Sequence, residues 1–293
     1  MLQFPISFYY KEASSEYEDF TATFDTTKAG SASDTLVLPY AGGNTTYWGD
    51  GSDSTSNTHT YDTGGTYLVH VEGAVSLRFN EGGDCLKLID VKSWDTLSVT
   101  AHSAFGGCLN MTVSATNAPS MNTCEKMFNK CESILNIDFT NWDTSGVSNF
   151  ASFLADCDGL TSLDVSALDM SSATSISSMF TRCHGLTSLD TTGWDTSSVT
   201  SMYGVFKDCN GTFTDMDFTD WDFNAVTNMG DFLKNTAMST TDYSNMLIEM
   251  DSQTVQSSVT LNGGNSKYNT NGGTARASLI SSDSWSISDG GAE

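Results

Sequence analysis

Basic residues and proline are scarce in this chain. Its 293 residues include 12 lysines and arginines against 36 aspartates and glutamates, which gives a formal charge of −24, and only three prolines. A surface this negative repels the phosphates of nucleic acids and anionic membranes. We therefore expect no nucleic-acid partner, and the charge favours cationic partners instead.

Long apolar runs and catalytic motifs are missing as well. No stretch approaches the roughly 20 apolar residues that span a bilayer, and residues 1–6 lack the basic region and apolar core of a secretion signal. The expectation is a protein without membrane insertion, signal or anchor in this sequence. There is also no G-x-S-x-G elbow, no H-E-x-x-H and no glycine-rich phosphate loop. The sequence thus predicts a protein that is not an enzyme.

What the chain does contain is an internal repeat. Four segments align with a period of 26 residues, at 131–156, 157–182, 183–208 and 209–235, the last with one insertion. Such a period is typical of a unit that stacks on copies of itself, because one unit alone cannot bury its apolar side. The spacing of Leu160, Leu163 and Val165 resembles the strand of a leucine-rich repeat. A turn follows, and Met202 and Phe206 then predict a short helix in each unit.

The cysteines follow the repeat. Six occupy one equivalent position at spacings of 23, 23, 26, 26 and 26 residues, and the seventh, Cys124, replaces an ordinary apolar residue. The six are Cys85, Cys108, Cys131, Cys157, Cys183 and Cys209. The odd number and the absence of paired zinc-type spacing argue against a disulfide framework and against a structural metal. We expect these thiols to pack in the core as small apolar side chains.

The two ends of the chain have other patterns. Residues 1–84 contain short β-prone runs at 35–39, 66–71 and 75–79, which predict a small antiparallel β-sandwich. Residues 236–293 break the repeat and alternate helical and strand patterns, as expected of a module that closes the end of a stack. The predicted fold is mainly β with short helices: a β-sandwich (1–84), a leucine-rich-repeat-like solenoid (85–235) and a C-terminal α/β cap (236–293).

Several motifs carry a resemblance to known families. MFNKC (127–131), SMFTRC (178–183), GLTSLD (185–190) and WDTSSVTSM (194–202) resemble the repeat of the BspA-type leucine-rich-repeat family. WGDGS (48–52), with HTY (59–61) and GTY (65–67), resembles a polycystic-kidney-disease-like (PKD-like) domain. The combination is similar to proteins of bacteriophages and some bacteria. It implies a surface protein that adheres to or recognises other surfaces, and none of the matched positions is catalytic.

These expectations lead to a functional hypothesis. We expect a non-enzymatic protein on the surface of a bacteriophage virion, as a tail fibre, spike or capsid decoration, that attaches through the exposed solenoid face. Its partners would be other virion proteins and a host receptor or glycan, and its copies would form a symmetric homo-oligomer or follow the symmetry of the particle. One alternative is an adhesin on the extracellular bacterial surface. A second alternative is a glycan-degrading spike.

Two columns of aspartate are the candidate binding residues. On the outward face of the repeated strand stand Asp138, Asp164, Asp190 and Asp217, and in the following turn stand Asp143, Asp169, Asp195 and Asp222. One interpretation is that a column bonds the backbone N–H groups of its own turn. The other is a row that binds a ligand or a cation, for which Ca²⁺ suits the hard oxygen atoms. No other cofactor is expected.

A tryptophan column and the histidines complete the candidates. Trp142, Trp194 and Trp221 share a column with Leu168. Because leucine replaces the aromatic in one copy, we expect core packing and not a sugar-stacking platform. His59, His70, His102 and His184 share no spacing and make a weak catalytic or metal set.

Overall fold

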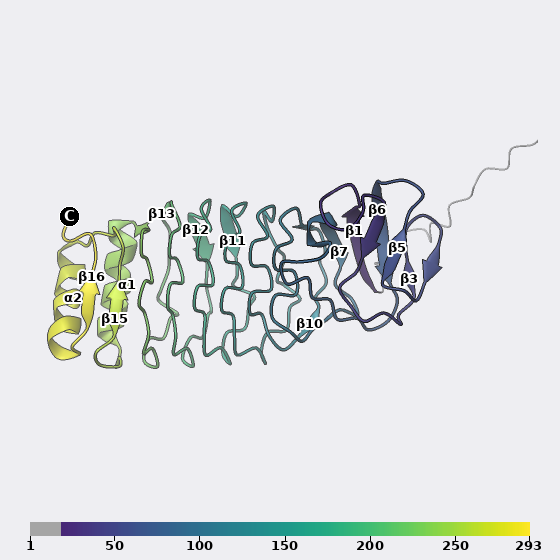
Figure 1. The fold of residues 1–293 in the computed structure, drawn as a ribbon. Helices are drawn as coiled ribbons and strands as arrows, with labels where there is room; N and C mark the ends of the chain where they lie inside the picture. The colour runs from purple at the N-terminus through teal and green to yellow at the C-terminus, as the bar shows by residue number, and fades with distance from the viewer. Residues whose placement is uncertain (1–18) are drawn as a thin grey trace, which may run out of the picture.

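The computed structural model describes residues 19–293, which form an elongated row of coils (Figure 1). A small group of β-strands lies at one end of the row, and two α-helices lie at the other. The chain is mainly β, with many short strands. In the N-terminal part the strands are β1 (Phe20–Asp25), β2 (Thr35–Val37), β3 (Thr46–Tyr47), β4 (Asp53–Ser54), β5 (Thr58–Thr60) and β6 (Thr66–Val71).

The N-terminal strands form one larger sheet and one small one. The larger sheet has the order β4-β3-β6-β1-β7-β9, and β2 pairs with β5 in the smaller one. The predicted runs at 35–39 and 66–71 are found as β2 and β6, but the run at 75–79 is not a strand, because Val75 makes only an isolated bridge to Leu97. β7 (Leu88–Ser93) and β9 (Thr112–Val113) extend this sheet, so it continues past residue 84.

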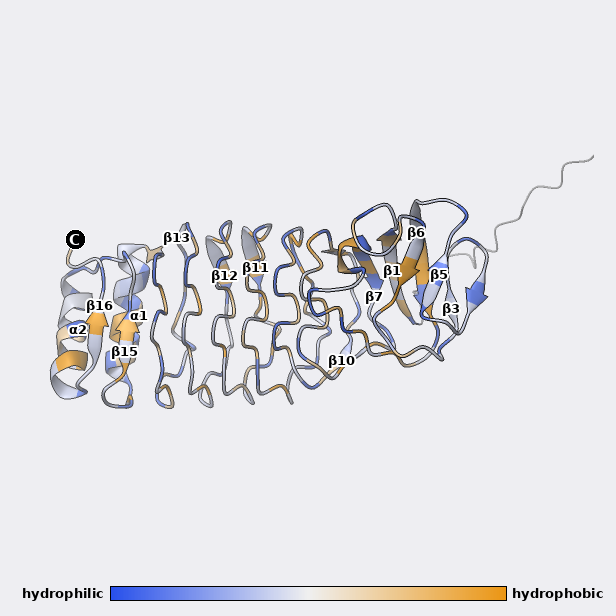
Figure 2. Cartoon of the chain, viewed as in Figure 1, coloured by the Kyte–Doolittle hydropathy of each residue, from blue (hydrophilic) through white to orange (hydrophobic). Residues whose placement is uncertain are grey.

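Successive coils then stack side by side, with short strands in parallel register. Apolar and polar residues alternate along each coil (Figure 2), so that one set lies inside the stack. The strands of this part are β8 (Ser98–Val99), β10 (Ser120–Met121), β11 (Ser162–Asp164), β12 (Ser188–Asp190), β13 (Thr212–Phe213) and β14 (Ala237–Met238). The pairs β8–β10, β11–β12 and β13–β14 are parallel.

Backbone hydrogen bonds join each coil to the next. In residues 150–156 every second N–H donates to a carbonyl oxygen of the following coil, in residues 175–181, at 2.8–3.0 Å. The same ladder runs from 124–130 to 149–155, from 176–182 to 201–207, and from 202–208 to 228–234. We call these pieces the turn segments. The N–H groups in between close tight turns within their own coil, as from Phe153 to Phe150.

The short helix predicted in each unit is wrong. In an α-helix each N–H bonds to the carbonyl four residues back, which would leave no donors for a neighbouring coil. Among the described residues 88–239 no helix forms, and the turn segments divide their donors between two coils. Apolar side chains at i and i+4 face the core in either arrangement, so Met202 and Phe206 are buried as expected.

Two positions in each turn segment have a left-handed backbone. φ is 55° and 60° at Ser152 and Asp156, and 58° at both Ser178 and Arg182. In the next coil Gly204 holds the place of Ser178, with φ 63°. Left-handed conformations cost residues with a Cβ roughly 1–2 kcal/mol, and here they direct alternate N–H groups to the next coil.

Substitutions at Ser178 test this backbone. We expect Ser178→Val to lower the free energy of unfolding by about 1–2 kcal/mol, because a β-branched side chain tolerates positive φ poorly. Ser178→Gly is the matched control, since Gly204 occurs at the equivalent position, and its change should stay within about 1 kcal/mol. Urea unfolding followed by circular dichroism measures both. Equal losses for the two variants would contradict the left-handed assignment.

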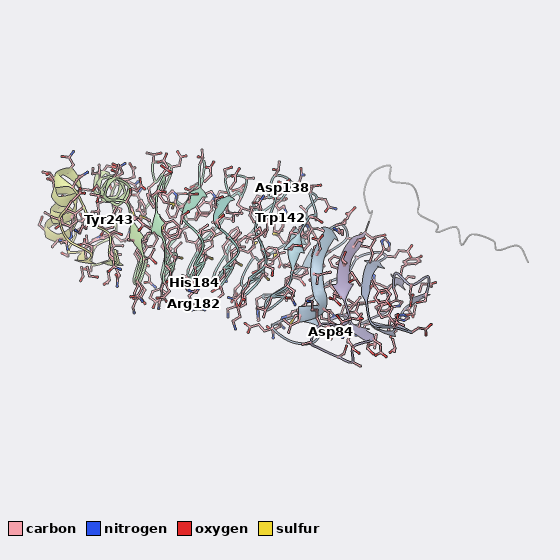
Figure 3. All side chains as sticks on the ribbon, turned by 90° about the horizontal axis from the view of Figure 1, so that it is seen from above. Asp84, Asp138, Trp142, Arg182, His184 and Tyr243 are labelled. Atoms are coloured by element: carbon pink, nitrogen blue, oxygen red, sulfur yellow. The ribbon has the colours of Figure 1, made fainter. Side chains whose placement is uncertain are left out.

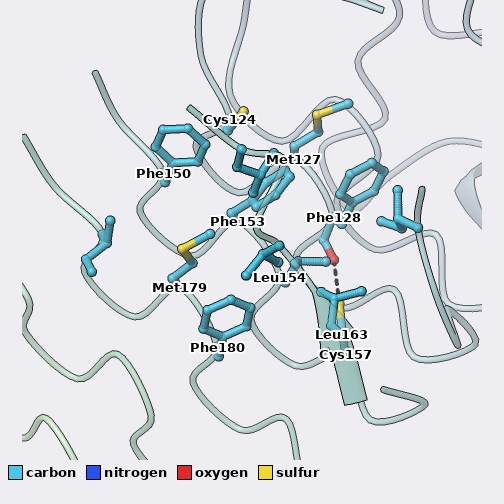
Figure 4. Close-up of a cluster of buried hydrophobic side chains, with 14 of the residues drawn as sticks. Cys124, Met127, Phe128, Phe150, Phe153, Leu154, Cys157, Leu163, Met179 and Phe180 are labelled. Carbon is cyan, nitrogen blue, oxygen red and sulfur yellow. Dashed lines mark hydrogen bonds between the residues drawn. The ribbon is translucent and has the colours of Figure 1, made fainter. Parts of the chain in front are cut away.

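The predicted burial of the cysteines is confirmed, and the thiols also donate hydrogen bonds. All seven are free and buried. In four successive coils the thiol donates to a backbone carbonyl of the preceding coil at 3.0–3.2 Å. Figure 4 shows this bond from Cys157 to Phe128. Burial raises the pKa of the Cys209 thiol to about 12 and that of Cys157 well above its usual range, so these groups stay protonated.

Aromatic side chains stack from coil to coil in the same core. The rings of Phe180 and Phe206 lie 5.8 Å apart at 5°, and those of Trp194 and Trp221 lie 5.6 Å apart at 28°. The members of the tryptophan column, with Leu168, are at most 5% exposed. The core role predicted for this column is therefore confirmed, because buried rings are out of reach of a sugar.

Two helices and two strands end the chain. They are α1 (Thr240–Ser252), β15 (Thr260–Asn262), α2 (Thr270–Ser282) and β16 (Ser286–Ser288). The side chains of Ser239 and Asn269 cap the two helices by accepting bonds from N–H groups of the first turn. β15 and β16 pair in parallel, with Leu261 opposite Ile287, so the 26-residue spacing continues here with helices in place of turn segments.

A buried ion pair joins the N-terminal strands to the first coil. Lys87 ends the 3₁₀ turn η1 (Cys85–Lys87) and lies 3.6 Å from the carboxylate of Asp84, with both side chains at most 1% exposed. The lysine Nζ donates to three carbonyl oxygens of the loop 31–35 at 2.6–3.2 Å. The carboxylate accepts bonds from the N–H groups of Ser31 and Val37, both at 2.6 Å. The sequence pattern does not indicate this pair.

Breaking the pair should be costly. Asp84→Asn leaves the lysine charge buried without its counter-ion, so we expect the free energy of unfolding to fall by about 3 kcal/mol. Asp62→Asn, at an exposed position of the same part of the chain, makes the same chemical change and should alter it by less than about 0.5 kcal/mol. Urea unfolding gives both values. A loss at Asp84 no larger than at Asp62 would contradict a structural role for the ion pair.

Candidate functional site

The four aspartates of the first column lie in one row along the exposed edge of the stack, which we call the strand face. Asp164 ends β11 and Asp190 ends β12, and the two residues are partners in the parallel register. Asp138 and Asp217 hold the equivalent places in the flanking coils, and all four are exposed. Figure 3 shows Asp138 at the outer edge of the stack, with Trp142 of the same coil further in.

Each of these carboxylates caps its own turn. One oxygen, Oδ1, accepts a hydrogen bond at 2.9–3.1 Å from the N–H two residues later, on Thr140, Ser166, Thr192 and Thr219 in turn. Hydrogen bonds from the side chain and backbone of Thr140 lower the pKa of Asp138, and those of Thr192 lower the pKa of Asp190. The structural interpretation of the column is thus found in every coil.

The second aspartate column does the same. Asp143, Asp169, Asp195 and Asp222 accept bonds at 2.7–3.2 Å from the N–H groups two residues on. Both columns therefore stabilise turns. Because their turn-capping hydrogen bonds are alike, this geometry alone does not identify either column as a binding site.

What distinguishes the strand face is its unbalanced charge. Within residues 19–293 the Oδ2 atoms of Asp138, Asp164, Asp190 and Asp217 make no hydrogen bond or ion pair with the chain. In the coils from residue 108 to 235, which carry the row, the basic residues all lie in or next to the turn segments: Lys126, Lys130, Arg182, Lys207 and Lys234. The strand face therefore presents a row of free carboxylate oxygens without a counter-charge.

A shallow hollow crosses the strand face over three coils. It has a volume of about 410 Å³ and is lined by Leu135, Asn136, Ser162, Leu163, Asp164, Ser188 and Asp190. A second hollow of about 230 Å³ adjoins it around Asp138. Leu135 is 68% exposed, where the next two coils carry threonine. Leu135 was not among the residues predicted from the sequence, although an apolar residue in a column with Thr161 and Thr187 is a visible signal.

A calcium site on this face stays a prediction. No group of three or more histidine, cysteine, aspartate or glutamate residues comes together as a metal site in the described part of the chain. The aspartates of the row meet in neighbouring pairs, such as Asp164 with Asp190. A cation here would take the rest of its oxygen ligands from water or from a partner.

The histidines lie with separate partners. His59 pairs with Asp50 and His184 with Asp158, each at 2.7 Å, and the side chain of His102 contacts Arg78. Each of these three histidines therefore contacts a different partner, and the three do not form a common site.

Coils of one repeated unit, stacked in parallel register with an open strand face, define a repeat protein. Three overlapping matches, at residues 79–183, 122–246 and 152–273, together cover most of the chain and fall in the family described as "Mycoplasma protein of unknown function, DUF285". The chain belongs to this family, which is associated with BspA-like surface repeat proteins. No curated protein and no solved structure matches the chain. In the described residues no helix has the length and apolarity needed to cross a membrane.

The turn-capping role of Asp190 predicts a specific pH dependence. Because its pKa is lowered in the folded state, its ionised carboxylate stabilises the fold above the pKa of the unfolded chain, about 3.9, and this contribution is lost as the pH falls through the folded pKa. At pH 7 the wild type should exceed Asp190→Ala by less than about 1 kcal/mol in free energy of unfolding. The difference in free energy of unfolding between the wild type and Asp190→Ala should be smaller at pH 3.

Asp190→Asn supplies the control for this pH dependence. An amide oxygen accepts the same bond from Thr192 without titrating, so the difference between Asp190→Asn and Asp190→Ala should not change with pH. Urea unfolding of the three proteins at pH 7 and pH 3 gives the comparison. A wild-type advantage that is equal at both pH values would show that the carboxylate charge is not what caps the turn.

Proposed function

We propose that this chain is a non-enzymatic recognition protein on the surface of a bacteriophage virion, as part of a tail fibre, spike or capsid decoration. It attaches to a host receptor or glycan through the strand face, and other virion proteins hold it in several copies on the particle. The family's association with surface repeat proteins supports a surface role. The virion assignment rests on the arrangement of repeats and flanking segments in the sequence.

The observation that carries the proposal is the composition of the strand face. Free carboxylate oxygens, the hydroxyls of Ser162 and Ser188, the amide of Asn136 and the exposed apolar side chain of Leu135 line one continuous hollow. Hydrogen-bonded turns and a parallel ladder hold these groups at fixed spacing. A face ordered in this way loses little conformational freedom on binding, which favours recognition over a wide area.

The same face gives no support to glycan cleavage. Glycosidases use two carboxyl groups with different roles, and the general acid needs a raised pKa. At Asp138 and Asp190 the hydrogen bonds from the following turn lower the pKa, which is the opposite change. Repetition also makes the aspartates alike, whereas the chemistry needs two unlike groups.

At the level of fold, we propose that the stacked coils are a solenoid of the BspA-type leucine-rich-repeat kind and that the N-terminal strands are a PKD-like sandwich. Parallel bridges at one place in successive coils, linking Asn149, Ser175, Ser201 and Asn228, support the solenoid. The WGDGS turn supports the PKD-like assignment, with Trp48 fully buried and Asp50 bonded to Ser52. Both assignments leave the proposed binding face unchanged.

A bacterial cell-surface adhesin is the second candidate function. The family description names a bacterium, Mycoplasma, which favours this alternative. Both functions would use the strand face, and they differ in where the protein is found.

Binding to host cells tests the role of the strand face. Leu135→Asp replaces the apolar side chain of the hollow with a charge, and Ser188→Arg fills the hollow with a long side chain. We expect either to reduce binding of the labelled protein to whole host cells at least 10-fold, since each removes a contact of about 1.4 kcal/mol or more. Thr200→Arg, an exposed position outside the hollow, is the matched control and should bind as wild type. If Leu135→Asp and Ser188→Arg both bind as well as the wild type, the strand face is not the binding surface.

Immunogold labelling separates the two locations. With an antibody against the chain, the virion proposal expects gold on intact, purified particles at positions related by the particle's symmetry. Label on uninfected bacterial cells and none on particles would reject the virion and support the adhesin.

A further inference from the structure

The edge of the stack formed by the turn segments carries its charges differently from the strand face. One residue per coil occupies the second left-handed position: Lys130, Asp156, Arg182 and Asp208, followed by Asn235. We call this row the turn-edge row. The sign of its charge alternates from coil to coil, and all five residues have φ between 58° and 61°.

Members of the row contact their neighbours. Arg182 pairs with Asp156 through two hydrogen bonds, of which the one from Nη2 to Oδ2 is 2.6 Å long. Asn235 donates to the carboxylate of Asp208 at 2.6 Å. At the start of the row Lys130 pairs at 2.6 Å with Glu81, which lies two coils earlier, because Gly107 holds the place in the coil between them. Each charge in the row therefore has an opposite charge or a hydrogen-bond donor beside it.

The core alone distinguishes poorly between one coil and the next. Every coil presents a buried cysteine at the same place, and Phe128, Leu154, Phe180 and Phe206 offer similar apolar surfaces. A chain that loops out one coil and stacks the flanking two would keep most of these core contacts. In near-identical repeats such misassembly is the characteristic folding error.

The turn-edge row changes when a coil is skipped. Leaving out 157–182 places Asp156 beside Asp208, and leaving out 131–156 places Lys130 beside Arg182. Like charges one strand spacing apart, about 4.8 Å, repel, whereas the native neighbours attract or are neutral. In the native order no two neighbours in the row have the same sign, and omission of either of these two coils breaks that pattern.

We propose that the alternating charges of the turn-edge row set the order in which the coils of residues 131–182 stack, because leaving out either coil 131–156 or coil 157–182 brings like charges together. The row is a device of the fold itself and does not depend on what the strand face binds.

One substitution tests the proposal, because its effect on the melting temperature should change sign when the neighbouring residue in the row changes. In the full chain, Asp208→Arg lies beside Arg182 and should lower the melting temperature by about 2 °C. In a chain that lacks residues 157–182, the same substitution lies beside Asp156 and should raise the melting temperature by about 2 °C. The lost bond to Asn235 is common to both chains, so only the preceding coil distinguishes them.

Asp215→Arg is the matched control. It makes the same charge change at an exposed residue with φ 60° that lies outside the row. Its effect should have one sign in both chains. Raising NaCl to about 0.5 M should shrink both Asp208 effects, because salt screens exposed charges. An effect of the same sign in the full and shortened chains would overturn the proposal.

Charge exchange in the full chain covers the case in which the shortened chain does not fold. Arg182→Asp puts three aspartates in succession and should lower the melting temperature. Adding Asp156→Arg and Asp208→Arg restores the alternation from 156 to 208 with inverted signs, and should recover most of the loss. No recovery in the triple variant would also overturn the proposal.

Discussion

Alternate backbone N–H groups of each turn segment bond to the next coil, and the rest of the structure depends on this division. A helix would satisfy its own donors and stand alone, but a coil built this way leaves half of them for its neighbour. The left-handed residues follow, because they turn those groups outward. Complete satisfaction of buried N–H groups therefore requires a stack, and the same stack covers the apolar side of each coil.

The two edges of the stack use charge in different ways. On the turn edge, neighbours such as Asp156 and Arg182 satisfy each other within the chain. On the strand face, the aspartates are bonded only to their own turns, and their second oxygens face solvent. The charges of the turn edge are thus paired within the chain, whereas the free carboxylate oxygens of the strand face are available to an external partner.

Periodicity in the sequence predicted which residues are buried better than it predicted the backbone conformation. The cysteine spacing placed Cys157 and its equivalents inside, and the exchange of tryptophan for Leu168 identified a buried column. The short helix was a wrong prediction, because side chains at i and i+4 face the core in a helix and also in the observed turns. Positive φ at Ser178 or Arg182 leaves no mark in composition, since neither residue favours that region.

The candidate site was predictable only in part. The aspartate row followed from the repeat, and so did its role in capping turns. Leu135 did not, because it departs from the repeat, and alignment of the units emphasises what they share. The pair of Asp84 and Lys87 escaped prediction for another reason: their partners at 31–37 are about 50 residues away in the sequence, and only the fold brings them together.

Coil-to-coil hydrogen bonding has a mechanical consequence. The ladders that join the coils run along the row, so a pull on its two ends would load them in series, one interface after another. Each coil of the regular repeat that detaches would release 26 residues, or about 90 Å of extended chain, and the two earlier coils would release 23 residues each. Under tension the molecule would lengthen in steps of similar size and so absorb work, while the coils still in the row kept their shape.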